Sequence, residues 1–381
     1  MTSVCIDARW LDGGIGTYTL NLVRELASLD DVKLAGLTLP RHAAVLGKIC
    51  SDLRLVGSPM YSLREQFEIA HATRRAPLLH VPHYNAPLAY NGTLLVTVHD
   101  LTHIVESRFR RSWKSWGYAQ PMLRLVTRKA AHIFTVSEYS KRQIIERLGV
   151  SGDRITVVPN GVAAHFYPEL RSEAGERLER ACEISGPYIL YVGNFKPHKN
   201  LGNLLRAFAT LVGTASFSCS LVLAGEDPIH EPELRRLAGK LGLNNSVRFL
   251  GHISDDLLRA AYSAAKLTVL PSFEEGFGLP VLESMACGTP VACSRAAALP
   301  ETGGQAAVYF DPRDVDSIAA AMRLLLESPT DWEWYRQSGL KRAQCFTWAD
   351  CAVRHLQVYR RYGPLPSRAE DDLPAEVLTK S

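Results

Sequence analysis

The chain has 381 residues, 46% of them hydrophobic and 22% charged, and a formal net charge of +4. This length exceeds what one hydrophobic core usually supports, so two domains are expected. The charge is too weak to argue for nucleic-acid binding. The sequence has no apolar run close to the roughly 20 residues that a membrane-spanning helix needs, which leaves peripheral attachment as the expected kind of membrane association.

Two further features predict a cytoplasmic protein. The eight cysteines form no Cys-x-x-Cys pair, and several lie in apolar runs, so reduced thiols are preferred over zinc ligands or disulfides. The sequence opens almost at once with an expected strand, and its start carries Asp7 and Arg9, which is unlike a secretory signal peptide. We therefore expect a cytoplasmic location, with peripheral contact to the inner face of the cell membrane left open.

In chain order, short apolar runs predict strands and longer amphipathic segments predict helices. The strands of the first half are expected near 3–7, 33–39, 53–56, 78–81, 94–98, 132–136 and 155–158. Those of the second half are expected near 188–192, 219–223, 247–250, 267–270, 290–293 and 307–310. Helices are expected at 17–29, 62–74, 114–131, 138–148, 201–213, 231–241, 254–264, 279–287, 314–327 and within 331–362.

Alternating strands and helices predict an α/β protein with parallel sheets. The pattern occurs twice, with a seam at 159–170, so two Rossmann-like, doubly wound domains that face a cleft are expected. We place them at 1–163 and 168–345, with a C-terminal helix at 346–362 that packs back on the first domain. Residues 364–381 are expected to form a flexible tail.

The segment 272–291 contains the most informative motif. Glu275 is followed by Gly276, Phe277 and Gly278, and a helix-compatible run then carries Glu283. The first amides of a helix can hold phosphates, whereas carboxylates accept hydrogen bonds from sugar hydroxyls. A glycine-rich helix start between two acids therefore suits a sugar nucleotide.

A second glycine-rich turn follows the first expected strand. Gly14 and Gly16 resemble half of a dinucleotide fingerprint, but Thr19 replaces the third glycine and the expected acidic residue is not evident. A nicotinamide-dependent oxidoreductase is thus a weaker hypothesis. A backbone that approaches an anion or an acceptor sugar, or a tight turn without a ligand, also fits.

Two other loops are expected at the edge of the cleft. His99 and Asp100 end an apolar strand, but the sequence lacks the serine or cysteine elbow of a catalytic triad. Lys196 and Lys199 lie in the loop after the first strand of the second domain, where they could neutralise a pyrophosphate. Plain solvated lysines and a structural histidine are the alternatives.

No metal site and no cofactor are expected. The histidines have no metal-binding spacing, and His99 and His103 have no evident third ligand. Helix amides and lysines would then offset the charge of a leaving group. Residues 106–118 interleave cations with aromatic rings, which suits an anionic lipid surface or an ordinary exposed basic face.

Together these motifs resemble the GT4-type retaining glycosyltransferases of GT-B fold. The resemblance covers about residues 1–350 and is most specific in the Glu-x7-Glu segment from Glu275 to Glu283, with Gly-Phe-Gly-Leu-Pro inside it. The regions 80–104 and 191–201 are similar to bacterial mannosyltransferases that build surface polysaccharides.

The resemblance implies a role for each matched residue. Glu275 would bind donor-sugar hydroxyls, Glu283 the ribose and Lys199 the pyrophosphate, while His99 would lie beside the reacting sugar carbon. Main-chain amides would come from Gly276, Phe277, Gly278 and Leu279, and Gly14 and Gly16 would lie near the phosphates and the acceptor. Asn194 stands where many relatives have arginine, so Lys196 is a candidate for the second phosphate cation.

The implied reaction moves a hexose, with retention, from a nucleotide diphosphate sugar to a saccharide or lipid-linked saccharide. GDP-mannose is the preferred donor, with UDP-glucose and UDP-N-acetylglucosamine left open. From other classes, a nicotinamide oxidoreductase and a non-catalytic sugar-binding module remain alternatives.

Overall fold

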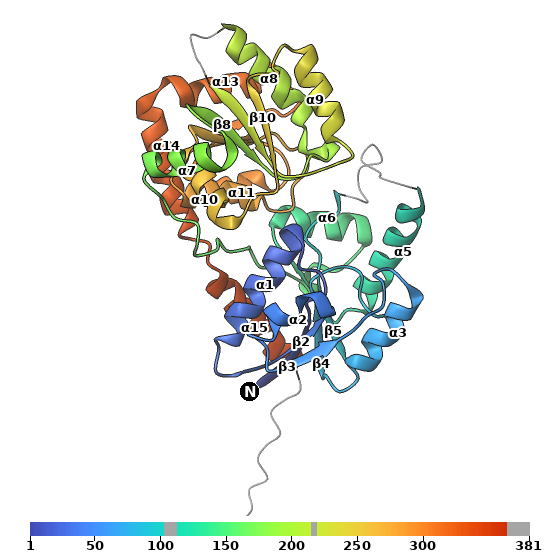
Figure 1. Ribbon diagram of the computed structural model, residues 1–381. Helices are drawn as coiled ribbons and strands as arrows, with labels where there is room; N and C mark the ends of the chain where they lie inside the picture. The colour runs from blue at the N-terminus through green and yellow to red at the C-terminus, as the bar shows by residue number, and fades with distance from the viewer. Residues whose placement is uncertain (103–112, 215–218, 364–381) are drawn as a thin grey trace, which may run out of the picture.

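The computed structural model describes residues 1–102, 113–214 and 219–363, with only the backbone described for 113–118 and Thr214. These residues form two sheets of seven and six strands, and neighbouring strands within them run parallel. Figure 1 shows two α/β domains stacked along the long axis of the molecule. The expected fold class is confirmed.

The first sheet has the order β3-β2-β1-β4-β5-β6-β7, with helices on both faces. Its strands are β1 (Thr2–Asp7), β2 (Val32–Thr38), β3 (Asp52–Leu55), β4 (Leu78–Val81), β5 (Thr93–Thr97), β6 (His132–Thr135) and β7 (Ile155–Val157). The helices around it are α1 (Gly13–Ala27), α2 (Ala43–Leu46), α3 (Leu63–Ala72), α5 (Trp113–Lys129) and α6 (Glu138–Leu148).

The second sheet has the order β10-β9-β8-β11-β12-β13. Its strands are β8 (Tyr188–Val192), β9 (Ser220–Ala224), β10 (Val247–Gly251), β11 (Leu267–Leu270), β12 (Val291–Ser294) and β13 (Ala307–Phe310). The helices that follow the seam are α7 (Arg171–Cys182), α8 (Leu201–Thr214), α9 (Glu231–Lys240), α10 (Asp255–Ala264), α11 (Leu279–Ala286), α12 (Leu299–Gly303), α13 (Val315–Glu327), α14 (Pro329–Ala343) and α15 (Trp348–Tyr362).

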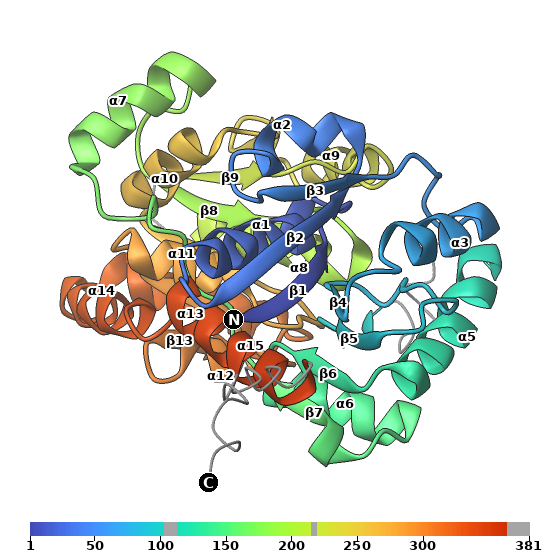
Figure 2. The ribbon, with the colours of Figure 1, turned by 90° about the horizontal axis from the view of Figure 1, so that it is seen from below.

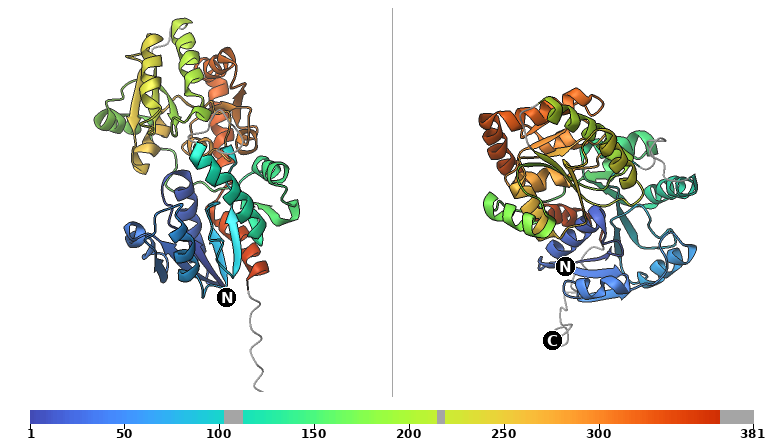
Figure 3. Two further views of the ribbon diagram at one scale, coloured as in Figure 1. Left: turned by 90° about the vertical axis from the view of Figure 1, so that its right-hand side faces the viewer. Right: turned by 45° about the horizontal axis from the view of Figure 1, so that its top comes forward.

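In both sheets the strand order reverses at the first strand, between β1 and β4 and between β8 and β11. Loops diverge at such a switch point, which is where ligands bind in open α/β sheets. Figures 1 and 3 show the two domains meeting at their loop-bearing edges, so the two switch points lie on facing sides of the domain boundary.

All thirteen expected strands are present, but three of the described helices, α2, α7 and α12, are missing from the sequence-based prediction. Helices α2 and α12 have only four and five residues, too few to show a helical period. Helix α7 is strongly charged, and only Ala174 and Leu178 are buried along it, so its apolar stripe is too thin to reveal the helical period. The expected helical region 331–362 is divided into α14 and α15.

Helix α15 returns to the first domain and packs against α1, as Figure 2 shows from below. Buried polar contacts fix it there. Tyr18 hydrogen-bonds to Nε2 of His355 at 2.8 Å, and the Tyr359 hydroxyl lies 2.6 Å from Nδ1 of His80. Burial lowers the pKa of His355 to about 4, so this ring is neutral at pH 7.

Two segments cross between the domains side by side. The amide of Val162 donates to the carbonyl of Phe346 at 3.0 Å, and Val162 pairs with Thr347 in an isolated parallel bridge. A Cβ atom on Gly161 would lie 2.2 Å from the backbone nitrogen of Trp348. The close approach of these crossings therefore requires glycine at position 161.

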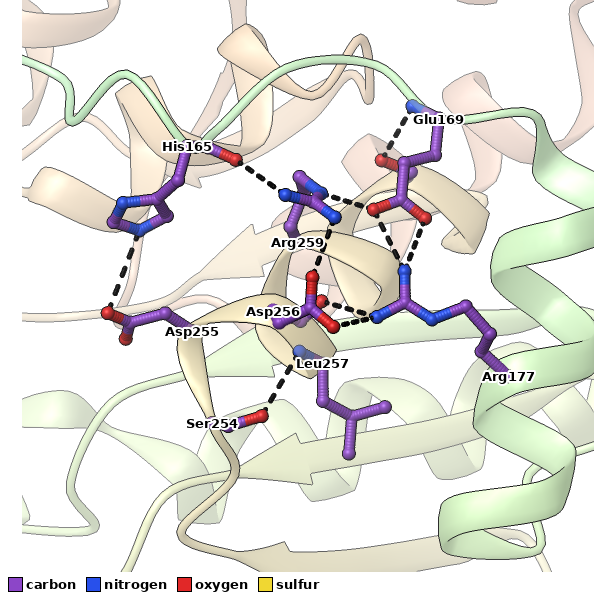
Figure 4. Close-up of polar contacts among 9 residues, drawn as sticks. His165, Glu169, Arg177, Ser254, Asp255, Asp256, Leu257 and Arg259 are labelled. Atoms are coloured by element: carbon purple, nitrogen blue, oxygen red, sulfur yellow. Dashed lines mark hydrogen bonds and ion pairs between the residues drawn. The ribbon is translucent and has the colours of Figure 1, made fainter.

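After the crossing, ion pairs anchor the seam to the second domain (Figure 4). The Glu169 carboxylate binds Nη1 of Arg177 on α7 at 2.9 Å and also Nε of Arg259 on α10. Asp256, at the start of α10, binds the same two guanidinium groups. Glu169 is thus fixed to the second domain. A hinge motion would therefore bend the few residues before Glu169 and the returning segment near Phe346.

Candidate active site

The site begins where the first domain contacts the loop between β11 and α11. The Ser137 hydroxyl donates to the carbonyl of Gly276 at 2.8 Å, and the Ser140 hydroxyl donates to the carbonyl of His99 at 2.9 Å. A Cβ atom on Gly276 would lie 2.6 Å from the oxygen of His99. Glycine at position 276 therefore lets the expected donor loop meet the backbone of His99 across the domain boundary.

Lys199 and Glu275 contact each other at the switch point of the second sheet. Nζ of Lys199 lies 2.6 Å from Oε1 of Glu275, and the Ser272 hydroxyl donates to the same oxygen at 2.9 Å. Both charged side chains are largely buried, with 16% and 13% of their surface exposed. Limited access to water strengthens such a pair, so the two loops are held together by charge.

The loop between Glu275 and α11 is fixed through its carbonyl groups. Ser137 binds the carbonyl of Gly276, and the Thr302 hydroxyl donates to the carbonyl of Phe277 at 2.5 Å. In a trans peptide the C=O and N–H groups point in opposite directions, so the amides of Phe277 and Gly278 face away from these partners. Helix α11 starts at Leu279, as expected.

Glu283 lies deeper in the second domain, on α11. Its Oε2 atom accepts a hydrogen bond from the Tyr262 hydroxyl at 2.8 Å. Burial raises the pKa of Glu283 to about 7, and the charge of Asp255 acts in the same direction, while the Tyr262 hydrogen bond opposes them. The expected ribose-binding acid thus titrates near neutral pH.

His99 is half-buried between the two domains. Its Nε2 atom donates to the carbonyl of Pro82 at 3.2 Å, and its ring packs edge-on against Tyr18 with centroids 4.7 Å apart. Burial lowers the pKa of His99, which favours the neutral ring. In that form Nδ1 carries no proton and can accept a hydrogen bond.

The glycine-rich turn of the first domain forms the first turn of α1. The backbone of Leu11 would clash with a Cβ atom on Gly16, at 2.1 Å, whereas a Cβ atom on Gly14 would meet open space. Tyr18, one turn further on, reaches His99. The structure therefore places this turn near His99 but gives Gly14 no packing reason to be glycine.

Lys196 lies three residues before Lys199 in the same loop. Its amide lies 3.3 Å from Oδ1 of Asn194, and a short 3-10 turn, Pro197–Lys199, separates the two lysines. Asn200 follows in a left-handed conformation and donates to the carbonyls of Pro271 and Pro312. Asn200 thereby fixes the backbone next to Lys199, while the role of Lys196 stays a prediction.

The sequence has one Asp-x-Asp triplet, at 314–316, a pattern that can hold a divalent cation on a pyrophosphate. In the structure Asp314 caps α13, because its Oδ1 atom accepts hydrogen bonds from the amides of Asp316 and Ser317. Within the described residues, no group of three His, Cys, Asp or Glu side chains has a metal-binding arrangement.

Several residues at the domain boundary were not expected from the sequence. The Glu301 carboxylate of α12 accepts hydrogen bonds from the amides of Glu138 and Tyr139, both at 2.7 Å. These amides belong to the first turn of α6, where partial positive charge favours an anion. The Tyr139 hydroxyl also donates to Oε2 of Glu274 at 2.7 Å. The first turn of α6 is therefore bound to the second domain across the boundary.

The basic and aromatic segment 106–118 lies outside the described residues, apart from the helical backbone of α5 from Trp113. Across the described part of the chain, the helices are too short or too polar to cross a membrane.

Comparison with known proteins identifies the family. Residues 12–166 match the family described as Glycosyltransferase Family 4, and residues 183–342 match Glycosyl transferases group 1. The chain is 30% identical to O-antigen chain mannosyltransferase B of Escherichia coli over 366 residues, which is 91% of this chain and 96% of that protein. The chain belongs to the group 1 glycosyltransferases.

A second relative of this glycosyltransferase is named MMP alpha-(1->4)-mannosyltransferase, from Mycolicibacterium hassiacum. It is 31% identical over 255 residues, which cover 66% of this chain and 58% of that protein.

Solved structures agree with the fold. The complex of HepE from Anabaena with UDP-glucose superposes with a TM-score of 0.79 at 16% identity, over 95% of this chain and 100% of the other. Sucrose-phosphate synthase from Thermosynechococcus elongatus superposes with a TM-score of 0.77 at 22% identity, over 95% of this chain and 99% of the other. The GT-B architecture is thereby confirmed, and the family match argues against the nicotinamide oxidoreductase.

Proposed function

We propose that this glycosyltransferase moves mannose from GDP-mannose, with retention of anomeric configuration, to a saccharide or lipid-linked saccharide in cell-surface polysaccharide synthesis. The main structural support is the Lys199–Glu275 pair at the switch point of the second sheet, next to the contact of Gly276 with His99. The names of the mannosyltransferase relatives support the choice of sugar.

In the proposed reaction the diphosphate leaves toward Lys199 and the amides of Phe277 and Gly278. Glu275 accepts hydrogen bonds from the donor-sugar hydroxyls, and Glu283 accepts them from the ribose. Charge that develops on the leaving oxygens is met by fixed dipoles and an ammonium group. We expect no divalent cation to be required.

Retention is proposed to arise by attack from the face that the diphosphate leaves. The acceptor oxygen bonds to the anomeric carbon as the carbon–oxygen bond to the diphosphate breaks, and the departing oxygen takes the hydroxyl proton. His99, with its neutral ring, would lie beside the reacting carbon. Closure around the 159–170 seam would exclude water, which otherwise competes with the acceptor.

The acceptor would be reached from the cytoplasmic side of the membrane. Residues 106–118 are the candidate contact with lipid, on the ground of their sequence alone.

A panel of nucleotide sugars tests the proposal. GDP-mannose should raise the melting temperature more than UDP-glucose, UDP-N-acetylglucosamine or NADH, because a ligand that binds only the folded state stabilises it. Transfer to a mannose disaccharide should give an α-linked product by NMR and should persist in chelator. A β-linked product would contradict retention, and loss of activity in chelator would contradict a reaction that needs no divalent cation. Preference for a UDP-sugar would contradict GDP-mannose as the donor. Donor binding without transfer to any acceptor would favour the non-catalytic sugar-binding module.

A further inference from the structure

The ring of His99 contacts Pro82 and Tyr18 of the first domain. Its Nε2 atom donates to the carbonyl of Pro82 at 3.2 Å, and the ring of Tyr18 meets it at 86° with centroids 4.7 Å apart. A carbonyl can only accept, so the proton of the neutral ring lies on Nε2 and Nδ1 remains an acceptor. The orientation of Nδ1 therefore depends on what holds Pro82 and Tyr18.

The loop that carries Pro82 is fixed by a buried carboxylate. Nδ2 of Asn85 donates to Oε1 of Glu65 at 2.9 Å, and Nη1 of Arg9 donates to the same oxygen. Glu65 lies fully buried on α3, and Arg9 follows β1. Limited access to water strengthens such hydrogen bonds. The acceptor of the His99 hydrogen bond thus belongs to a loop with little freedom to move.

Tyr18 is fixed by a chain of buried hydrogen bonds. Its hydroxyl lies 2.8 Å from Nε2 of His355 on α15 and 3.0 Å from Oγ1 of Thr97 on β5. Oγ1 of Thr97 lies 2.7 Å from Nε2 of His80 on β4, whose Nδ1 atom lies 2.6 Å from the Tyr359 hydroxyl. All five side chains are buried. The chain of hydrogen bonds therefore begins and ends on α15 and passes through β4 and β5.

One contact sets the direction of every bond in this chain. Burial lowers the pKa of both His355 and His80, so the two rings are neutral at pH 7. Nδ1 of His355 lies 2.8 Å from the carbonyl of Cys351, which can only accept, so Nδ1 carries the proton. Nε2 of His355 must then accept from the Tyr18 hydroxyl, whose oxygen accepts from Thr97. The same reasoning gives the two remaining bonds the same direction along the chain.

These bonds leave the ring of Tyr18 one favourable orientation. Its hydroxyl donates to α15 and accepts from β5, while its backbone belongs to α1. A turn of the ring would leave buried polar atoms of His355 and Thr97 without partners, which is costly. Figure 2 shows α15 beside α1 on the underside of the molecule. The surface that Tyr18 presents to His99 is therefore set by the C-terminal helix.

We propose that Tyr18 is a positioning residue for His99, and that His355 makes the C-terminal helix part of the support of the reaction centre. This inference rests on the proposed function, in which His99 lies beside the reacting sugar carbon. The chain of hydrogen bonds holds the neutral ring of His99 in one orientation, so that Nδ1 stays available to a hydroxyl of the substrate. The return of α15 to the first domain then serves the reaction as well as the fold.

Removal of the Tyr18 hydroxyl tests this role. Y18F keeps the ring but breaks the bonds to His355 and Thr97, so kcat should fall five- to tenfold while the KM for GDP-mannose stays within about twofold. Y359F is the matched control, because it removes a hydroxyl from an equally buried tyrosine at the other end of the same chain. Its kcat should stay within about twofold of the wild type. Urea denaturation should show similar losses of stability in both variants, so that a difference in kcat reports position.

Replacements at position 355 separate position from packing. H355Q keeps an acceptor near the place of Nε2 and should retain at least half of the wild-type kcat. H355L has no such acceptor and should match Y18F. NMR of enzyme labelled with 15N-histidine should show the Nε2-protonated form of His99 in the wild type and in H355Q, and a mixture of tautomers in Y18F and H355L.

The outcomes distinguish this inference from the proposed function. Equal kcat in Y18F and Y359F, equal kcat in H355Q and H355L, or an unchanged His99 signal in Y18F would overturn the positioning role. A folded H99A enzyme with wild-type turnover, or a wild-type enzyme that transfers sugar to no saccharide, would instead overturn the proposed function.

Discussion

The ammonium group of Lys199 lies 2.6 Å from a carboxylate oxygen of Glu275, and this ion pair joins the β8–α8 loop to the β11–α11 loop. The two strands are neighbours in the sheet although their loops are 76 residues apart in sequence. A residue proposed to hold the diphosphate and a residue proposed to hold the sugar thus form one unit. Replacing either residue should therefore weaken the contacts of both the diphosphate and the sugar of the donor.

We predict that E275A and K199M each lower kcat by about two to three orders of magnitude, the usual cost of removing one group that stabilises developing charge. K196M serves as the comparison, because Lys196 lies in the same loop, three residues before Lys199, and is the candidate for the second diphosphate cation. Initial rates with saturating donor and acceptor provide the measurement.

Folding of these variants should be followed by circular dichroism, since an unpaired and largely buried charge also destabilises. E275Q keeps the shape of the side chain and separates the two effects. Full turnover in either E275A or K199M would remove these residues from the site. A larger loss in K196M than in K199M would reassign the diphosphate cation.

The sequence predicted the strands well because most are short, largely apolar runs rich in β-branched residues and buried on both faces, as in Leu267–Leu270. Helix α7 escaped prediction because only Ala174 and Leu178 are buried along it. The sequence-based prediction already placed the C-terminal helix against the first domain. Its buried partners, such as Tyr18 and His355, lie 337 residues apart and cannot be paired from sequence alone.

Contacts between residues that lie far apart in the sequence also limit how much of the site can be predicted. Lys199 was predicted from its place after an expected strand at the cleft edge, and Glu275 from the glycine-rich segment that follows it. The pairing of Arg9 with Glu65 was not, because 56 residues separate them and only the β1–β4 switch point brings them together. Glu301 resembles an ordinary acid in the first turn of a short helix, and its contact with α6 depends on how the domains meet.

Glu283 leads to a prediction about pH. Burial holds the pKa of its carboxyl group at about 7, so a fraction is protonated at neutral pH. Ribose hydroxyls that donate to the carboxylate would favour the ionised form and lower that pKa. Donor binding should therefore release a proton and should tighten as the pH rises from about 6 to 8, by at most tenfold per pH unit.

Isothermal titration calorimetry in buffers of different ionisation enthalpy measures this proton release directly. The ligand should be the nucleotide sugar, because its diphosphate does not titrate in this range, unlike that of the free nucleotide. E283Q should bind the donor more weakly and without pH dependence. Proton uptake, or a pH-independent affinity in the wild type, would contradict the proposed ribose contact.

Glu301 leads to a prediction about domain closure. Its carboxylate accepts hydrogen bonds from the first two amides of α6, and one-third of the side chain is exposed. E301Q removes the charge at this helix terminus and should weaken the closed state by about 1 kcal/mol, after allowance for solvent screening. We expect the donor KM to rise about fivefold and the radius of gyration from small-angle scattering to increase.

The matched control for this change is Glu327 on α13, whose partner Arg323 lies on the same helix. E327Q should change neither the donor KM nor the scattering profile. An E301Q enzyme with wild-type kinetics and dimensions would show that the contact of α12 with α6 is incidental to closure.

Two glycine-to-alanine changes separate the domain crossing from a general effect of glycine. At position 161 the added methyl group would lie 2.2 Å from the nitrogen of Trp348, so the two crossing segments would have to move apart. G161A should lower the free energy of unfolding by about 2 kcal/mol or more, in the range typical of overpacking, and should reduce kcat because the crossing lies at the seam.

Gly175 lies within α7, and an added Cβ atom there would meet open space. G175A should therefore stabilise the protein by up to about 1 kcal/mol, through helix propensity, with kcat unchanged. Urea denaturation with parallel rate measurements tests both changes, and equal behaviour of the two variants would mean that the close packing at Gly161 does not govern the seam.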